Sequence, residues 1–265
     1  KTLVPGDQVF AAVRFGAYAE IAVAAERLVW RKPERLEIEE AAGFPTALAT
    51  AVHGIEHLAH ARPGERILVH SAAGGVGLMA TQLAKRLGLH VTGLVGRRAK
   101  VDLALKFGAD EVLAREDGDV NARLQALPPF DVIMNASGGP GLRTSYALLA
   151  PMGRLVVFGA ATMLDPGRVR ANWIKLAWRY LPTPRFMPLD LVMQNRAVMG
   201  FNLVHLFASA ELATRMHARL DELARAKDFR PLPTESLSAP DIALAHERLQ
   251  SGQTTGKLVL TWPAS

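Results

Sequence analysis

A glycine-rich segment at residues 71–77, Ser-Ala-Ala-Gly-Gly-Val-Gly, holds the residue types best suited to chemistry in this chain. It lies between an apolar run at 67–70 and a helical pattern at 77–87. Gly74 would let the backbone approach an anion, and Gly77 would let the helix pack closely on the preceding strand. Because the free N–H groups and the dipole of a helix N-terminus attract negative charge, the segment predicts a diphosphate-binding turn.

The surroundings of this turn strengthen the prediction. Ala72 occupies the first glycine position of the G-x-G-x-x-G pattern, which weakens the bare motif. However, a strand before it, a helix after it and a second strand beyond supply the βαβ context that the motif requires. The competing interpretation is a glycine-rich turn that binds nothing, and we favour dinucleotide binding.

The end of the second strand distinguishes between the two nicotinamide cofactors. Residues 91–101 contain no acid, and Gly96 is followed by Arg97 and Arg98. NAD-binding folds usually place an acid here to hold the ribose 2′-hydroxyl, whereas guanidinium groups can bind a 2′-phosphate. The sequence therefore predicts NADPH, against the alternative that both arginines are solvated loop charges.

Alternating apolar and amphipathic runs predict the elements that position this turn. Strands are expected at 67–70, 91–95, 111–114, 130–134, 154–158 and 197–203. Helices are expected at 77–87, 100–107 and 142–149, and another follows the strand at 111–114 and ends near 127. Gly88 and Gly108 are typical residues for ending helices. Apolar strands separated by helices predict an α/β fold with a doubly wound parallel sheet.

The flanking segments predict a different organisation. Residues 1–32 predict short strands and turns, including a β-leaning run from Phe15 to Val23, and residues 37–60 predict a helix broken near Pro45. Further helices are expected at 208–226 and 241–251, and a last strand at 257–262. Residues 172–181 predict a short amphipathic helix, which we interpret as a lid or dimer contact rather than a membrane contact.

Composition and missing motifs exclude several functions. The chain has no cysteine, which excludes disulfides, thiolate metal sites and a cysteine nucleophile. Its net charge of +6 is concentrated in one segment, so we expect no nucleic-acid partner. Neither a Tyr-x-x-x-Lys pair nor a G-x-S-x-G elbow is present. His53 and His57 match H-x-x-E-H, but without an identifiable third ligand we interpret them as a packed histidine face and expect no metal.

Several stretches resemble the medium-chain dehydrogenase/reductase superfamily in its zinc-independent quinone-oxidoreductase branch. They are PGDQV at 5–9, GAYAE at 16–20, AAGFP at 41–45, PGE at 63–65, AAGGVG at 72–77, GADEV at 108–112 and GKLVL at 256–260. The stretch QNRAVMGF at 194–201 is most similar to the VAT-1-type subgroup. They follow the order of the family from one end of the chain to the other.

The resemblance implies a Rossmann domain inserted in a GroES-like β-rich domain. We place the partial GroES-like domain at 1–45, the Rossmann dinucleotide-binding domain at 46–230 and the return to the GroES-like domain at 231–265. Since the family begins some tens of residues earlier, the chain is expected to be N-terminally incomplete. The proton donor stays unknown, and Tyr18 is interpreted as a structural strand residue.

The resemblance also implies a set of cofactor-binding residues, spread over the ends of several strands. They are Thr50 near the nicotinamide or phosphate, Gly74, Gly75 and Val76 at the pyrophosphate, Gly96, Arg97 and Arg98 at the 2′-phosphate, Arg115 beside the adenosine, Ser137, Gly138, Gly139, Phe158 and Gly159 along the cofactor, and Phe201 and Asn202 on the nicotinamide side. Lys257 is a further, weaker candidate for the cofactor site. The alternative interpretation of Gly159, Phe158 and Phe201 is that they are turn and core residues.

The function implied is an NADPH-dependent reductase that transfers hydride to quinones or α,β-unsaturated carbonyls without zinc. One alternative is an enoyl-thioester reductase. Another is a non-catalytic, membrane-associated or scaffold protein that keeps NADPH binding. We expect a small-molecule substrate, a homodimer and a cytoplasmic location.

Overall fold

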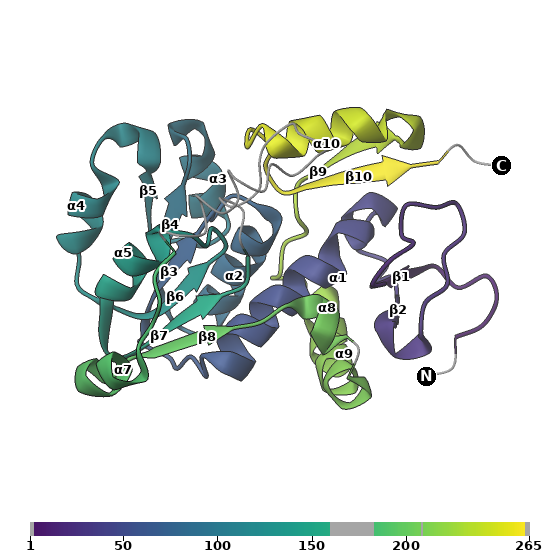
Figure 1. Cartoon of the computed structure of the whole chain (residues 1–265). Coiled ribbons are helices and arrows are strands. Elements are labelled where there is room, and N and C mark those ends of the chain that lie inside the picture. The colour runs from purple at the N-terminus through teal and green to yellow at the C-terminus, as the bar shows by residue number, and fades with distance from the viewer. Residues whose placement is uncertain (1–2, 160–182, 208, 263–265) are drawn as a thin grey trace. The chain divides into compact units, whose positions relative to one another are not determined.

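The computed structural model describes residues 3–159, 183–207 and 209–262 (Figure 1). The chain forms two compact units, Lys1–Thr50 with Asn202–Ser265, and Ala51–Phe201. We call them the first and the second unit. The amphipathic helix predicted at 172–181 lies outside the described residues.

The second unit is built on a six-stranded parallel sheet in the order β5-β4-β3-β6-β7-β8. The strands are β3 (Arg66–His70), β4 (His90–Val95), β5 (Glu111–Ala114), β6 (Phe130–Asn135), β7 (Leu149–Val157) and β8 (Ala197–Gly200). Their central residues are apolar because helices cover both faces of the sheet. The predicted α/β fold with a doubly wound parallel sheet is therefore confirmed.

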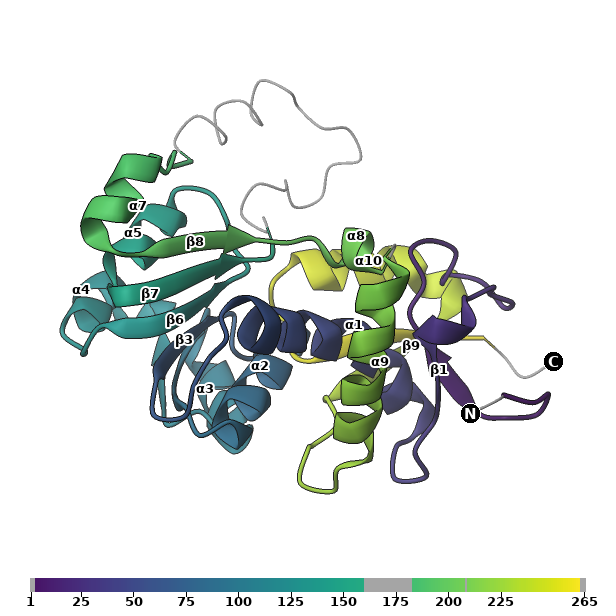
Figure 2. The same cartoon turned by 90° about the horizontal axis from the view of Figure 1, so that it is seen from below.

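Helices lie on both sides of this sheet, with α2 and α3 on one face and α4 and α5 on the other (Figure 2). They are α2 (Gly75–Arg86), α3 (Val101–Lys106), α4 (Val120–Gln125) and α5 (Gly141–Ala147), and α7 (Pro188–Gln194) precedes β8. Gly88 and Gly108, with φ of +80° and +104°, follow the ends of α2 and α3 as predicted. Leu68 and Leu94 of the sheet pack with Leu124 of α4 in the hydrophobic core on the face that α4 and α5 cover.

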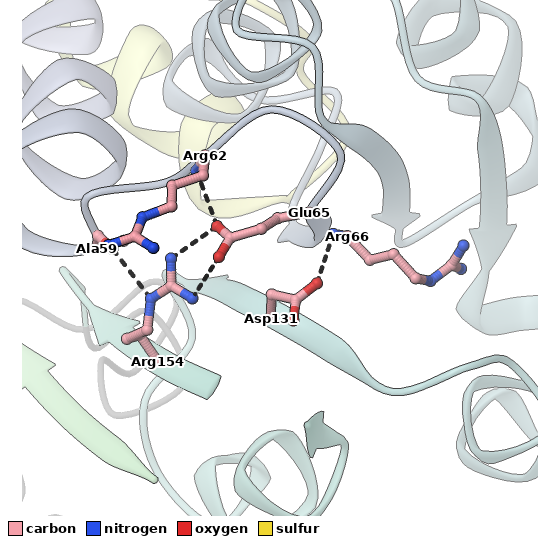
Figure 3. Close-up of polar contacts among 6 residues, drawn as sticks. All are labelled: Ala59, Arg62, Glu65, Arg66, Asp131 and Arg154. Carbon is pink, nitrogen blue, oxygen red and sulfur yellow. Dashed lines mark hydrogen bonds and ion pairs between the residues drawn. The ribbon is translucent and has the colours of Figure 1, made fainter. Parts of the chain in front are cut away.

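An ion-pair cluster fixes the segment that leads into the sheet (Figure 3). Both guanidinium Nη atoms of Arg154 bind the Glu65 carboxylate, at 3.0 and 2.7 Å, and its Nε donates to the Ala59 carbonyl at 3.0 Å. The Arg66 backbone N–H donates to Asp131 at 2.8 Å. These bonds tie the loop after the π-helix His53–Leu58 to β3, β6 and β7.

The first unit has a mixed architecture. It contains β1 (Val9–Ala11) antiparallel to β2 (Val29–Arg31), and β9 (Thr234–Ser238) parallel to β10 (Lys257–Thr261). Its helices are α8 (Leu203–Leu206), α9 (Ala210–Arg225), α10 (Ile242–Gln250) and most of α1 (Ile38–Val52), which ends in the second unit. Trp30 stacks between Phe10 and His217, at centroid distances of 5.5 and 5.0 Å, in its core.

Two local predictions are wrong. Pro45 does not break the helix, because α1 continues through it and the neighbouring side chains of Phe44 and Leu48 are fully buried. That packing outweighs the loss of one backbone donor. Residues 15–23 form bends rather than a strand, and Tyr18 is exposed and makes an edge-to-face contact with His246.

The boundaries of the two compact units fall after Thr50 and after Phe201. The domain limits of 45/46 and 230/231, which come from the family resemblance, stay a prediction. The Trp30 indole donates to the His217 carbonyl of α9 at 3.1 Å, and Arg35 donates to the Ala224 carbonyl at 2.8 Å. These bonds place α9 with the first unit, although its position in the sequence suggested the Rossmann domain.

Candidate functional site

The glycine-rich turn connects β3 to α2 at the carboxyl edge of the sheet. Ser71 adopts a left-handed conformation with φ of +54°, and its carbonyl accepts the Gly74 N–H at 2.8 Å. Gly74 is the N-cap of α2 and makes no side-chain cap. The residues from Gly74 to Val76 are partly exposed, as a helix N-terminus that binds an anion requires.

Close packing requires glycine at one position around this turn and favours it at a second. A Cβ on Gly77 would lie 2.2 Å from the Ser71 carbonyl oxygen, which no side chain tolerates. A Cβ on Gly93 of β4 would lie 3.1 Å from the Ala72 methyl group. The sequence analysis identified Gly77 but missed Gly93, although a glycine inside a strand pattern often marks such a close approach.

Positive charge gathers after β4, where the 2′-phosphate is predicted. Gly96, Arg97 and Arg98 are exposed, and burial together with the charge of Arg97 lowers the pKa of Lys100. Arg98 is engaged, because its Nε and Nη2 both lie 3.0 Å from the Asp117 carboxylate. The sequence analysis missed Asp117, which follows the neighbouring strand β5 and reaches this site only through the fold.

A polar cluster lies at the ends of β3, β5 and β6, in which His70, Asn135 and Ser145 are buried and Arg115 is exposed. His70 contacts Arg115 at 3.4 Å and Ser145 at 3.3 Å, and Asn135 donates to Ser145 at 3.0 Å. With Ser137 they line a cavity of about 370 Å³. Burial and then the Arg115 charge lower the pKa of His70 to about 3, so its ring is neutral near pH 7.

The loop after β6 is held by one of these side chains. The Asn135 carboxamide oxygen accepts the backbone N–H groups of Ser137 and Gly138 at 2.8 and 3.0 Å. Gly138 and Gly139 then take φ of +67° and +63°. The sequence analysis predicted Ser137 and Gly138 but missed Asn135, His70 and Ser145. An asparagine directly before this loop was the available signal, because Asn side chains often bond the backbone two residues on.

Aromatic residues surround the ends of β7 and β8. Phe158 and Phe201 stack at a centroid distance of 6.2 Å, and the His53 ring lies 4.8 Å from Phe201. Gly159 is required because a Cβ would lie 2.6 Å from the Ala136 carbonyl oxygen. His53 is buried, and burial and then the charge of His57 lower its pKa to about 4.

The remaining predicted residues belong to the first unit. The Thr50 hydroxyl donates to the Thr46 carbonyl at 2.8 Å. The Asn202 side chain caps α8 by accepting the Val204 N–H at 3.1 Å. The Lys257 stem would meet a Cβ on Gly43 at 3.2 Å, and burial lowers the pKa of its amine. The structure therefore gives Thr50 and Asn202 roles in helices, and their part in cofactor binding stays a prediction.

The family profile described as "Zinc-binding dehydrogenase" matches residues 75–221. A structural or catalytic zinc needs three or four nitrogen, sulfur or oxygen ligands from side chains. Among the described residues, no group of three or more His, Asp or Glu side chains could hold a metal ion, and the sequence contains no cysteine. The residues that the structure describes do not fit a zinc site, so no step is derived through zinc.

Three relatives illustrate what the chain is similar to. It is 30% identical to the synaptic vesicle membrane protein VAT-1 homolog of Danio rerio, over 97% of this chain and 53% of that protein. It is 32% identical to the spectinabilin polyketide synthase system protein NorB of Streptomyces orinoci, over 98% of this chain and 11% of that protein. The solved quinone oxidoreductase of Thermus thermophilus, also studied in complex with NADPH, is 31% identical with a TM-score of 0.78, over 97% of this chain and 78% of that one.

These comparisons agree with the architecture of the second unit. The chain spans about half the length of the VAT-1 homolog that it matches. The family profile begins at Gly75, at the end of the turn, and covers the strands after β3 and the helices as far as most of α9. The chain belongs to the zinc-binding dehydrogenase family, within the medium-chain dehydrogenase/reductase superfamily, and its relatives include the VAT-1 and quinone-oxidoreductase proteins that the sequence predicted.

Proposed function

We propose that the second unit binds NADPH and that the whole protein is an NADPH-dependent reductase of quinones or α,β-unsaturated carbonyls. The observation that carries the proposal is the turn from Gly74 to Gly77. Its accessible helix N-terminus lies at the carboxyl edge of the sheet, next to the point between β3 and β6 where the strand order reverses. Doubly wound sheets bind dinucleotides at this point.

Each part of the site has a role toward the cofactor. The backbone of Gly74, Gly75 and Val76 would hold the pyrophosphate, and Gly96, Arg97 and Arg98 would surround the 2′-phosphate. Ser137, Gly138, Phe158 and Gly159 would border the dinucleotide. When bound, NADPH supplies the hydride, and the tasks left to the chain are orientation and exclusion of water from the nicotinamide. Phe201 and, from the first unit, Thr50, Asn202 and Lys257 are proposed for the nicotinamide end.

Cofactor choice tests the 2′-phosphate site. Each hydrogen bond from a charged group contributes about 1.5–3 kcal/mol, so Arg97→Ala should weaken NADPH binding by about tenfold or more and hardly affect NADH. Arg98→Ala should have a smaller effect, because Asp117 already engages its guanidinium. Fluorescence titration with both cofactors measures this, and equal losses for NADPH and NADH would refute the assignment.

Turnover tests the substrate class. Similarity to a quinone oxidoreductase supports a quinone, and similarity to a polyketide synthase protein supports the alternative of an enoyl-thioester substrate. We expect the full-length protein to oxidise NADPH faster with a simple quinone than with crotonyl-CoA. The reverse order would favour the enoyl-thioester reductase.

The third candidate is a non-catalytic protein that retains the cofactor, for which the VAT-1 homolog is the supporting relative. Tight NADPH binding without turnover on a panel of quinones and enones would establish it. Within the described residues, no helix is both long enough and apolar enough to cross a membrane. Fractionation of cells with the full-length protein would test our expectation of a cytoplasmic location.

We further propose a homodimer. β8 forms one edge of the six-stranded sheet and pairs only with β7 among the described strands. Edge strands of this kind offer unpaired backbone groups to another chain. Light scattering on the eluting full-length protein measures its mass, and a monomer at micromolar concentration would contradict the proposal.

A further inference from the structure

Four polar side chains meet at one corner of the 370 Å³ cavity of the second unit. They are His70 at the end of β3, Arg115 after β5, Asn135 at the end of β6 and Ser145 in α5. The rest of the lining combines apolar side chains, Leu94, Leu124 and Leu148 among them, with the polar residues Asn121, Ser137 and Thr144. A small cavity with a few convergent polar groups is typical of a ligand site.

The donors and acceptors of this corner fix the proton positions on His70. The Arg115 guanidinium can only donate, so His70 Nδ1, 3.4 Å away, must accept. Because the imidazole is neutral, its hydrogen then lies on Nε2, which donates to the Ser145 hydroxyl oxygen at 3.3 Å. The His70 tautomer is therefore set by Arg115.

The orientation of Asn135 is fixed in the same way. Its carboxamide oxygen already accepts two backbone N–H groups, from Ser137 and Gly138. Its amide nitrogen therefore faces Ser145 and donates to the hydroxyl oxygen at 3.0 Å. The Ser145 oxygen thus accepts two hydrogen bonds, and its own hydrogen needs a separate acceptor.

No acceptor for the Ser145 hydroxyl hydrogen occurs among the described residues. Hydroxyls in helices commonly donate to the carbonyl four residues earlier, as Thr50 and Thr214 do at 2.8 and 2.9 Å. Ser145 makes no such bond, and it lines the cavity with only 1% of its surface exposed. A buried donor without an acceptor points to a partner that binds in the cavity.

We propose that Ser145 donates its hydroxyl hydrogen to a ring nitrogen of the adenine of the bound dinucleotide, and that His70 is a positioning residue that fixes the direction of this donor. The inference rests on the proposed cofactor. Adenine carries three ring nitrogens that only accept hydrogen bonds, and they suit a site that offers a hydroxyl donor. Arg115, which has no carboxylate partner among the described residues, supplies a planar guanidinium that can lie against the face of a base.

Calorimetric titration with 5′-AMP and 2′,5′-ADP tests the adenine site alone. One hydrogen bond corresponds to about a three- to tenfold change in affinity, so Ser145→Ala should weaken both ligands by that factor. His70→Leu should weaken them similarly, and His70→Gln, which keeps an N–H donor, should recover most of the loss. The control is Thr81→Val, which removes a buried hydroxyl that has no hydrogen-bond partner among the described residues and lies outside the cavity lining, and it should change neither affinity.

Base analogues provide a comparison within each protein, because every analogue is measured against 5′-AMP on the same variant. Among the 1-, 3- and 7-deaza analogues of 5′-AMP, one should bind the unaltered protein three- to tenfold more weakly and bind Ser145→Ala without any further loss. Equal penalties in both proteins for all three analogues would overturn the role of Ser145. If 2′,5′-ADP binds no more tightly than 5′-AMP, the choice of NADPH fails while the adenine contact stands. If neither nucleotide binds, both proposals are wrong.

Discussion

The ion pair between Arg98 and Asp117 bears directly on the proposed 2′-phosphate site, because Asp117 engages a guanidinium that the phosphate would need. Asp117 lies on the segment after β5 and holds Arg98 by two contacts of 3.0 Å. The Arg98 side chain is 75% exposed, so this ion pair is screened by water and easily exchanged. A 2′-phosphate at this site would therefore compete with Asp117 for the same guanidinium.

Replacing Asp117 by Asn should strengthen NADPH binding. The substitution keeps the side-chain size and frees Arg98, so we expect the dissociation constant for NADPH to fall by about two- to fivefold, within the energy range of a surface ion pair. NADH, which has no 2′-phosphate, should bind as before. Fluorescence titration of both cofactors measures the change, and weaker NADPH binding would show that Asp117 orders the site instead of competing for it.

At the scale of elements, the contact between β3 and α2 depends on Gly77. A methyl group there would meet the Ser71 carbonyl oxygen at 2.2 Å, so α2 would have to shift away from the turn. We expect Gly77→Ala to destabilise the second unit by about 1–3 kcal/mol, with a fall in Tm of several degrees and a loss of NADPH binding. Gly96→Ala is the matched control, because its Cβ would meet nothing within 4 Å, and its Tm should not change.

The Arg154–Glu65 pair joins β7 to the segment before β3, as Figure 3 shows. Burial raises the pKa of Glu65, but hydrogen bonds from Arg154 and the Arg62 backbone outweigh it, so the pKa lies below its ordinary value. We expect Glu65→Gln to lower the free energy of unfolding by about 1–3 kcal/mol, because it weakens a half-buried charged pair.

Urea unfolding near pH 7 measures this loss. Its control is Glu222→Gln, which breaks the exposed pair with Arg219 and should change the free energy by less than about 0.5 kcal/mol. A comparable loss for both variants would show that the Arg154–Glu65 pair stabilises no more than a surface pair does.

At the scale of the whole molecule, the elements that follow from periodic apolar patterns could be predicted from the sequence. The apolar runs and the glycines at 88 and 108 were enough to predict the sheet and the ends of α2 and α3. Contacts between residues far apart in the sequence were not predictable, since no pattern near Arg98 indicates its ion pair with Asp117. The same limit explains Pro45, which stays helical only because its neighbours are buried.

Buried neutral histidines should make the molecule sensitive to acid. The folded state lowers the pKa of His70 from 6.5 to about 3 and that of His53 to about 4, in both cases chiefly by burial. Between the folded and the unfolded pKa, the unfolded chain binds a proton that the folded chain does not bind. The free energy of unfolding should therefore fall as the pH falls below about 6.5, by about 1.4 kcal/mol per pH unit for His70.

His70→Gln separates this contribution from that of the carboxylates. Urea unfolding at pH 7, 6 and 5 should give the variant a shallower pH dependence than the unaltered protein, by roughly one proton. The remaining slope should include His53, whose folded pKa is also low. Since glutamine keeps an N–H donor toward Ser145, the variant should keep most of its stability at pH 7. Parallel pH dependences for the two proteins would mean that His70 is protonated in the folded state, and the donor order inferred for the Arg115–His70–Ser145 chain would then be wrong.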